Sequence, residues 1–284
     1  MPGKVIAVVN HKGGCGKTTT TCNLANSVAS RCKLKVLVID NDVQCNTTAM
    51  LLSGVDFDHS LYNVYKENPI PIENIIVPTL VHENLYCLPN SRESATVEKR
   101  LNAINVETKS FTGYRVLRNR VREYAINNFD LIFVDNAPNL GIFVMNALLM
   151  ADFALVPHEA GSRNSLEGLT TAIRFIQEIQ SDPIDGNPDL KFLRVLVTMA
   201  KKRTMVFRAL MGQLRRHLSE SDVFKTIISD STQFQQSELT STTMLQLCPT
   251  AAGTLAYRDL ADELTAILGM RPLAEGENYE RAAN

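Results

Sequence analysis

The sequence predicts an α/β protein with a doubly wound, mostly parallel β-sheet and helices on both faces. Short apolar runs alternate with longer amphipathic segments throughout the 284-residue chain, which is the pattern of successive βαβ units. Some runs, such as 36–39 and 131–134, are apolar at every position, as expected for strands that helices cover on both faces. A glycine-rich loop follows the first run and aspartates follow the second and fourth, at the strand ends where such sheets bind ligands.

One domain over residues 1–270 is expected from the length and composition of the chain. With 45% hydrophobic and 21% charged residues the composition is that of an ordinary globular protein, and a sheet of this size often forms a single unit. We expect a disordered tail over 271–284. No stretch is apolar enough for a transmembrane helix, and no signal-peptide pattern precedes the first strand, so we expect a cytoplasmic protein.

The alternation of apolar and amphipathic segments gives the expected elements in order. Strands are expected at about 4–10, 34–40, 84–89, 129–135, 152–157 and 192–198. Helices are expected at about 17–30, 112–127, 142–150, 163–180, 204–218 and 252–268. The segment 54–83, rich in Pro, Asn and aromatic residues, is expected to be irregular, and 181–188 is expected to be a loop between a helix and a strand.

The cysteines and histidines do not indicate a metal centre or a disulfide framework. The six cysteines contain no Cys-x-x-Cys pair, so scattered reduced thiols are the expected state. The five histidines are equally dispersed, and none has a partner at metal-ligand spacing. We therefore look for the chemistry of this chain in other residue types.

A phosphate-binding loop is predicted between the first strand and the first helix. The loop carries Gly13, Gly14 and Gly16, and Lys17 and Thr18 follow at the start of the expected helix. Glycines let successive backbone N–H groups converge on phosphate oxygens, and the N-terminus of the helix adds partial positive charge. The lysine can neutralise the β- and γ-phosphates, and the threonine hydroxyl can bind Mg²⁺.

Two residues at the front of this loop depart from the common P-loop pattern. Where that pattern has a glycine five residues before its Gly-Lys pair, this chain has His11, and a second lysine, Lys12, follows. The run 12–18, Lys-Gly-Gly-Cys-Gly-Lys-Thr, resembles the deviant Walker A motif of the ParA/MinD superfamily of ATPases, with Lys12 as its signature lysine. An ordinary solvated loop lysine is the alternative interpretation of Lys12.

The resemblance implies a P-loop NTPase fold of the deviant Walker A type, with ATP and Mg²⁺ as cofactors. The nucleotide-binding residues that it implies are Lys12, Gly13, Gly14, Cys15, Gly16, Lys17, Thr18 and Thr19. It also implies that ATP binding brings two subunits face to face, so that Lys12 reaches the phosphates of the other subunit and assists hydrolysis there. Residues 165–169 are similar to a helix that packs near the dimer interface in that family.

Two aspartates follow the second expected strand, in the run Val-Leu-Val-Ile-Asp-Asn-Asp-Val-Gln at 36–44. A carboxylate there can orient an attacking water and help to hold the Mg²⁺ shell. The run is similar to the family's switch I motif Asp-x-Asp-Pro-Gln, which assigns the hydrolytic role to Asp42, although Val43 replaces the usual proline. A turn-capping role is the alternative interpretation of both aspartates. It explains Asp40 as well as a role in hydrolysis does.

The fourth expected strand delivers Asp135 to its carboxyl end. Residues 129–141, Phe-Asp-Leu-Ile-Phe-Val-Asp-Asn-Ala-Pro-Asn-Leu-Gly, resemble the Walker B strand and switch II of the family. A carboxylate at that position can accept a hydrogen bond from a Mg²⁺-bound water, whereas a helix-capping aspartate is the alternative. The expected metal-site residues are Thr18, Asp42 and Asp135, and the expected catalytic residues are Lys12, Lys17 and Asp42.

Basic residues are concentrated in one stretch of the chain. The formal net charge of −1 predicts no affinity for nucleic acid, but residues 190–219 contain eight basic residues and no acidic one. The resemblance implies that the ATP-bound dimer binds DNA through backbone phosphates, and a solvated helix face is the alternative. Ser229 and Asp230 stand where the family commonly has Pro-Arg. The expected DNA contacts are Lys201, Lys202, Arg203, Arg208, Arg215 and Arg216.

The resemblance extends from the first strand to about Asp262 and is closest to ParA-type partition ATPases. It implies an ATP-hydrolysing switch for plasmid or chromosome partition. The homodimer with ATP would bind non-specific DNA on the nucleoid, and a ParB-like DNA-binding partner would release it by stimulating hydrolysis. Because only three residues precede the first expected strand, we expect no helix-turn-helix and no operator-specific repression.

Three other classes of protein share parts of this pattern. A MinD-like or cargo-positioning ATPase acting on a membrane or on protein clusters is the first. The MinD kind needs a C-terminal basic amphipathic helix, whereas this tail has few apolar anchors, so we expect no membrane contact. A reductase of the nitrogenase iron-protein type needs cysteines for an iron–sulfur cluster, and the segment directly after Asp135 has none. A non-enzymatic scaffold would require Asp42 to be inert.

Overall fold

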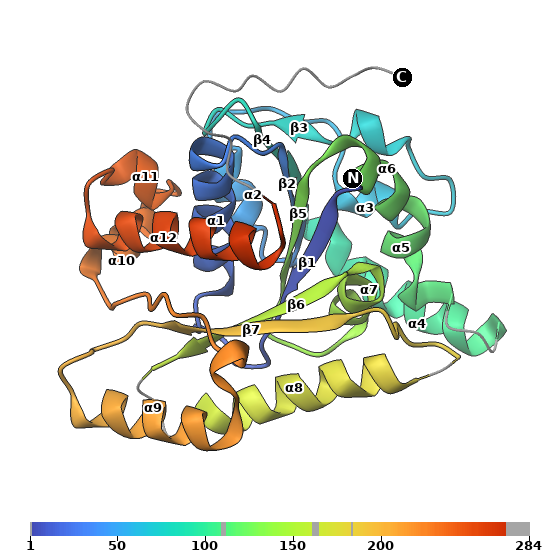
Figure 1. The fold of residues 1–284 in the computed structure, drawn as a ribbon. Coiled ribbons are helices and arrows are strands. Elements are labelled where there is room, and N and C mark those ends of the chain that lie inside the picture. Colours follow the sequence, from blue (N-terminus) through green and yellow to red (C-terminus); the bar gives the residue numbers. More distant parts are fainter. Residues whose placement is uncertain (1, 109–111, 161–164, 183, 271–284) are drawn as a thin grey trace.

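A single β-sheet runs through the middle of the molecule (Figure 1). The computed structural model describes residues 2–108, 112–160, 165–182 and 184–270, and within them the sheet has seven strands in the order β3-β4-β2-β5-β1-β6-β7. All neighbouring strands are parallel except β3 and β4, so the predicted mostly parallel sheet is confirmed. The strands are β1 (Lys4–Val8), β2 (Val36–Asn41), β3 (Val77–Pro78), β4 (Leu85–Leu88), β5 (Leu131–Asn136), β6 (Phe153–Glu159) and β7 (Lys191–Thr198).

The order of the strands brings distant parts of the sequence to one edge. β1 lies between β5 and β6, and β5 also pairs with β2. The register places Val8 and Asp40 on either side of Asp135, each as its Cα partner in the neighbouring strand. The carboxyl ends of β1, β2 and β5 therefore meet at the point where parallel sheets of this type bind ligands.

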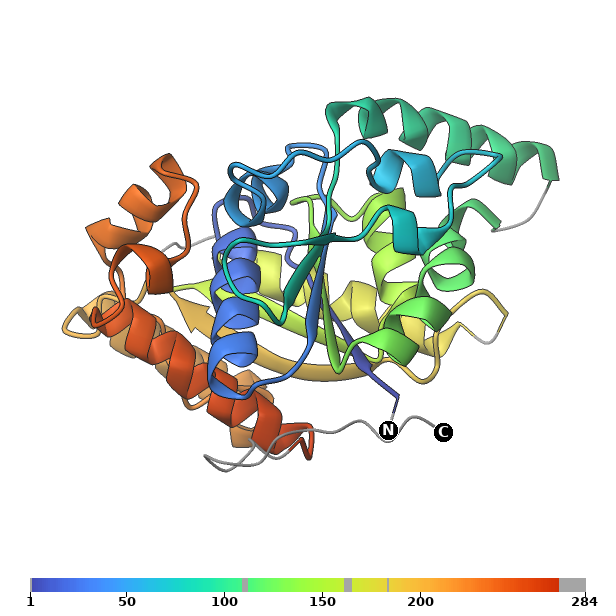
Figure 2. The ribbon, with the colours of Figure 1, turned by 90° about the horizontal axis from the view of Figure 1, so that it is seen from above.

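One face of the sheet is covered by helices from the beginning and the end of the chain. They are α1 (Lys17–Arg31), α2 (Asn46–Leu51), α10 (Thr232–Leu239), α11 (Met244–Leu247) and α12 (Ala252–Ile267). Leu24 and Val28 of α1 and Leu260 of α12 lie in one buried cluster with strand residues such as Val38. Helix α12 packs against α1 (Figure 2), and its Glu263 also pairs with Arg194 of β7.

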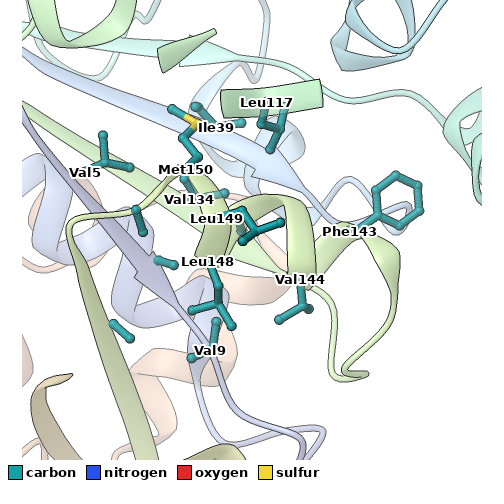
Figure 3. Packing of buried hydrophobic residues seen from close by; sticks show 14 of the residues in the cluster. Val5, Val9, Ile39, Leu117, Val134, Phe143, Val144, Leu148, Leu149 and Met150 are labelled. Atoms are coloured by element: carbon teal, nitrogen blue, oxygen red, sulfur yellow. The ribbon is translucent and has the colours of Figure 1, made fainter. Parts of the chain in front are cut away.

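The opposite face is covered by helices from the middle of the chain. They are α3 (Leu61–Val64), α4 (Val97–Thr108), α5 (Val116–Arg120), α6 (Arg122–Asn128), α7 (Ile142–Met150), α8 (Ser165–Ser181) and α9 (Met205–His217). Figure 3 shows side chains of α7, such as Leu148 and Leu149, against Val9, Ile39 and Val134 of the strands and strand ends. With helices on both faces, the predicted doubly wound fold is confirmed.

The helix predicted over 112–127 is wrong as a single element. A 3₁₀ turn over Thr112–Tyr114 is followed by α5 and α6, and Val121 between them has φ −117°. Arg120 donates to the carbonyls of Val64 and Lys66, whereas the guanidinium of Arg122 donates to Asp152. Because the two arginines are anchored to different parts of the fold, tertiary contacts interrupt the helix that the local pattern favours.

Several short elements of the structure were not predicted from the sequence. Helices α2, α3, α4, α10 and α11 were not predicted, and the segment 54–83 contains α3, a 3₁₀ turn over Ile72–Asn74 and β3. Capping boxes Ser60–Asn63 and Thr243–Gln246 open α3 and α11, and these are signals that a sequence carries. The predicted disordered tail, 271–284, lies outside the described residues, and one domain over 1–270 stays a prediction.

The remaining expected elements occur within a few residues of their predicted positions. The largest shifts are at the strands, where β1 ends at Val8 and β6 continues to Glu159. Val223 forms an isolated bridge with Val195 of β7, and Ser229 forms one with Ala200 just beyond β7, so this segment covers the edge of the sheet. Within the described residues, none of the helices has both the length and the apolar character to span a bilayer.

Candidate functional site

The loop between β1 and α1 has the backbone shape of an anion site. Gly14 and Gly16 have φ values of +71° and +84°, a conformation that favours glycine over residues with a Cβ. A Cβ at Gly14 would meet nothing within 4 Å, so the loop borders open space there. Helix α1 begins at Lys17 and no described side chain caps it, so the N–H groups of its first turn are available to a bound anion.

The two lysines of the loop have different environments. Lys17 is buried, with 7% of its surface exposed, and its Nζ donates to the carbonyl oxygen of Lys12 at 3.1 Å. The ammonium of Lys12 instead forms an ion pair with the carboxylate of Glu159 at the end of β6. The buried Cys15 thiol donates to the same Lys12 carbonyl at 3.2 Å, and burial raises its pKa, so this thiol is protonated at neutral pH.

Asp135 is the centre of a cluster of threonine hydroxyls. Its Oδ2 accepts from the hydroxyl of Thr18 at 2.7 Å and from that of Thr47 in α2 at 2.8 Å, and Oδ1 accepts from Thr21 at 3.2 Å. Burial raises the pKa of Asp135, whereas the hydrogen bonds from Thr18 and Thr47 lower it. The hydroxyl and the carboxylate predicted to serve Mg²⁺ are therefore in direct contact.

Asp40, near the end of β2, and Asp42, directly after it, have different surroundings. Asp40 is fully buried, and its Oδ2 accepts from the backbone N–H and the hydroxyl of Thr48 at 2.8 and 2.6 Å. Burial and the charge of Asp135 raise the pKa of Asp40 to about 7. Asp42 has 7% exposure and lines the cavity beside the glycine loop, while its Oδ1 accepts from the N–H of Gln44 at 3.0 Å.

A pair of asparagines that the sequence analysis missed joins the strand ends. Asn41 Nδ2 donates to Asn136 Oδ1 at 2.7 Å and to the carbonyl of Phe143 at 2.8 Å, and Asn136 Nδ2 donates to the carbonyl of Val8 at 3.2 Å. The ends of β1, β2 and β5 and the start of α7 are thereby linked. A signal was present, because the dipeptide Asp-Asn ends both apolar strands and the two copies lie in register.

Two adjoining cavities open beside this cluster. The first, of about 350 Å³, lies over the glycine loop, and the second, of about 210 Å³, shares Gly16, Thr19 and Glu238 with it. The hydroxyl of Thr19 donates to Glu238 at 2.9 Å where the two cavities meet. The first is lined by Gly14, Gly16, Lys17, Thr18, Thr19, Asp42, Gln44, Asn46, Ala49, Met50, Pro138, Glu238 and Ser241.

Five of the predicted nucleotide-binding residues line the first cavity, and three do not. Gly14, Gly16, Lys17, Thr18 and Thr19 form its floor, whereas Lys12, Gly13 and Cys15 are absent from its lining. Of the residues that line the second cavity, Gly16 and Thr19 were predicted to bind nucleotide and the others were not. The others include Thr198, Met199, Ile228, Asp230, Phe234 and Tyr257, which come from the end of β7 and from the C-terminal part of the chain.

The predicted DNA-binding cations gather on a loop and helix that leave the same edge of the sheet. Lys201, Lys202 and Arg203 are exposed in the loop after β7, and Arg208, Arg215 and Arg216 are exposed on α9. Helix α9 is capped by Thr204, whose hydroxyl accepts from the N–H of Phe207, and buries Leu210 and Leu214. In the described part of the chain, the ion pair of Lys201 with Asp230, at 3.5 Å, is the one salt bridge of these cations.

Comparisons with known proteins give a family match and two similar relatives for this chain. The model of a family described as an AAA domain matches residues 3–192. The chromosome-partitioning ATPase Soj of Thermus thermophilus is 33% identical over 263 residues, covering 92% of this chain and 95% of the relative. The sporulation initiation inhibitor protein Soj of Bacillus subtilis is 30% identical, covering 93% of this chain and 99% of the relative.

A solved structure has the same fold. Cobyrinic acid a,c-diamide synthase from Mycobacterium smegmatis, with bound ADP and magnesium, superposes with a TM-score of 0.75 at 25% identity. The alignment covers 95% of this chain and 98% of that protein. The likeness therefore extends beyond the loop to nearly the whole chain.

Proposed function

The chain belongs to the ParA/MinD superfamily of ATPases, and on that premise we propose that it is an ATP-hydrolysing switch for plasmid or chromosome partition. The observation that carries the proposal is the hydrogen-bonded pair Thr18–Asp135 beside Asp42, next to the cavity over the glycine loop. Phosphoryl transfer needs an anion cradle, a metal-holding hydroxyl and carboxylate, and a group that orients water. The name of the Thermus thermophilus relative supports the role in partition.

ATP and Mg²⁺ are the proposed cofactors, and the residues present fit them. The left-handed glycines and the uncapped first turn of α1 suit a polyphosphate, and the second cavity suits the nucleoside part because it adjoins the first and has an apolar wall. The likeness to a synthase that binds ADP and magnesium supports this assignment. When bound, Mg²⁺ neutralises charge on the phosphates during transfer.

Different residues of the chain have different proposed roles in ATP hydrolysis. The loop N–H groups and Lys17 bind the phosphates, for which Lys17 exchanges its hydrogen bond to the Lys12 carbonyl for phosphate oxygens. Thr18 and Asp135 are the residues that would hold the metal, Asp135 by way of a water. Asp42 accepts a hydrogen bond from the attacking water and orients it.

Two copies of the chain are proposed to form the active ATP-bound dimer, with Lys12 acting on the phosphates of the other copy. The exclusion of Lys12 from the lining of its own cavity supports an action elsewhere. A ParB-like DNA-binding partner would stimulate hydrolysis and dissolve the dimer. We propose that the protein works in the cytoplasm, on the nucleoid.

The exposed cations of the loop after β7 and of α9 are the proposed DNA-binding surface. Residues 201–216 carry no acidic side chain that would oppose a polyanion. A protein that neutralises phosphates with such cations releases counterions, so its affinity falls steeply as salt rises. The loop begins at the end of β7, whose Thr198 lines the second cavity, so the nucleotide and the DNA surface share a strand end.

Salt-titrated binding to DNA of random sequence tests the proposal. We expect tight binding with a non-hydrolysable ATP analogue and binding at least tenfold weaker with ADP. The double variant Arg208→Ala, Arg215→Ala should lower the slope of log affinity against log salt by about two, because each phosphate contact contributes about one.

The matched control removes two exposed cations from other helices, Lys99 of α4 and Arg118 of α5, in the double variant Lys99→Ala, Arg118→Ala. This control should keep the wild-type slope. Equal affinity for DNA in the ATP-analogue and ADP states would contradict a nucleotide switch. If both double variants lost DNA affinity equally, the total charge of the protein and not this surface would set the affinity.

A further inference from the structure

Lys12 is held by its own chain. Its ammonium pairs with the carboxylate of Glu159, and the two side chains are 25% and 28% exposed. Its carbonyl accepts from Lys17 Nζ at 3.1 Å and from the thiol of Cys15 at 3.2 Å. The predicted signature lysine is thus restrained at both its backbone and its side chain by contacts within its own chain.

Both ends of the ion pair are fixed by the fold. Asn10 accepts from the N–H of Lys12 at 2.9 Å and donates to the carbonyl of Pro157 at 2.6 Å, which ties the loop to the end of β6. Glu159 is the last residue of β6 and pairs in register with Thr198. A Cβ at Gly168 of α8 would approach Lys12 Cβ to 3.4 Å, so α8 packs closely on this lysine. Two constrained side chains lose less entropy on pairing than two free surface chains do.

The Lys12 ammonium cannot contact Glu159 of its own chain and the phosphates bound to a second copy at the same time. Attraction between unit charges falls with distance, so contact with one anion is made at the expense of the other. Lys17 adds a second link, because its movement to the phosphates removes the hydrogen bond that it donates to the carbonyl of Lys12. Nucleotide in the first cavity would therefore remove one restraint on the backbone of Lys12.

We propose that Glu159 is a positioning residue that withholds Lys12 in the monomer, so that release of this ion pair is a step in ATP-dependent dimerisation. The inference rests on the proposed role of Lys12 across the dimer. Removing the charge of Glu159 frees both symmetry-related lysines. With partly exposed ion pairs contributing 0.2–1 kcal/mol each, dimerisation should tighten by about two- to thirtyfold.

The test is the monomer–dimer equilibrium of Glu159→Gln, measured by sedimentation with a non-hydrolysable ATP analogue and magnesium. We expect a lower dissociation constant for the dimer, with the affinity of the dilute monomer for a fluorescent nucleotide changed less than about twofold. Glu159→Asp keeps the charge and should return the equilibrium toward the wild type. In the Lys12→Ala background, Glu159→Gln should have no effect.

Glu83→Gln is the matched control, because it makes the same chemical change on an exposed residue before β4, at the opposite edge of the sheet. Thermal unfolding of each variant shows whether it is folded. A dimer of Glu159→Gln that is no tighter than the wild type would overturn the inference. So would the same tightening in Glu83→Gln or in the Lys12→Ala background. Wild-type dimerisation by Lys12→Ala alone would instead contradict the proposed role of Lys12.

Discussion

At the scale of single residues, Asp40 and Asp42 lie two positions apart in the chain but their side chains have different surroundings. Asp40 is enclosed by the Thr48 hydroxyl and N–H, which tie the end of β2 to α2. Asp42 follows the end of the strand, so the chain has already left the sheet and its carboxylate lines the cavity. Both aspartates accept backbone hydrogen bonds, and Asp42 makes the turn contact with the N–H of Gln44. Because Asp42 of the two lines the cavity, it is the candidate for orienting water.

Asp42→Ala should lower the rate of ATP hydrolysis by about a hundredfold or more, because a group that positions the nucleophile contributes on that order. Nucleotide binding should stay within a few-fold of the wild type, since the loop and Lys17 are untouched. Phosphate release and fluorescent-nucleotide binding measure the two quantities, with the exposed Asp56→Ala as control. Hydrolysis at the wild-type rate would exclude Asp42 from catalysis.

At the scale of elements, the carboxyl end of β6 combines two opposite environments in adjacent residues. His158 is 1% exposed and its Nε2 has no described hydrogen-bond partner, whereas Glu159 pairs with Lys12. Burial, with the nearby Lys12 charge, lowers the pKa of His158 from its ordinary 6.5 to about 4. The strand alternates its side chains between the two faces, so neighbours in sequence meet different surroundings.

The free energy of unfolding should therefore fall as pH drops from about 6.5 to 4, because the unfolded chain takes up a proton on His158 that the folded chain resists. This single histidine makes the free energy of unfolding about 2 kcal/mol lower at pH 5 than at pH 8. The variant His158→Gln has no titratable group at this position. The free energy of unfolding of the wild type minus that of the variant should therefore fall by about 2 kcal/mol between pH 8 and pH 5. Chemical denaturation at both pH values measures it, and a difference independent of pH would contradict the low pKa.

At the scale of the whole molecule, the site is a product of strand order. β1, β2 and β5 are separated in sequence, and the parallel register brings the glycine loop, Asp42 and Asp135 to one edge between two hydrophobic cores. The second cavity adds residues from β7 and from α10 and α12. A ligand that spans both cavities would contact segments from the beginning, middle and end of the chain and stabilise the fold as a unit.

ATP with magnesium should accordingly raise the thermal unfolding temperature, on the order of 5 °C at a hundredfold excess over the dissociation constant. Lys17→Ala should abolish this shift, because it removes the cation on the cavity floor. Lys12→Ala should keep it at protein concentrations that favour the monomer, because Lys12 does not line the cavity. Differential scanning fluorimetry measures the shift, and a wild-type shift in Lys17→Ala would place the nucleotide elsewhere.

The sequence by itself determined the features that depend on local pattern. Apolar runs alternating with amphipathic segments predicted six of the strands and the helices on both faces, because burial requires that periodicity. The phosphate loop and the aspartates at the strand ends could be located for the same reason, since their chemistry needs fixed residue types at short spacing. The short α2 and the break at Val121 were missed, because long-range contacts outweigh weak local preferences there.

Only the tertiary structure decided which of these residues meet. Thr47 donates to Asp135, and Asn41 donates to Asn136, across separations of 88 and 95 positions in the chain. The pairing of Lys12 with Glu159 joins residues 147 positions apart. No local pattern encodes such contacts, because they follow from the order and register of parallel strands. The sequence therefore predicted the groups proposed to perform the chemistry, and the packing of the sheet determined which of them lie together.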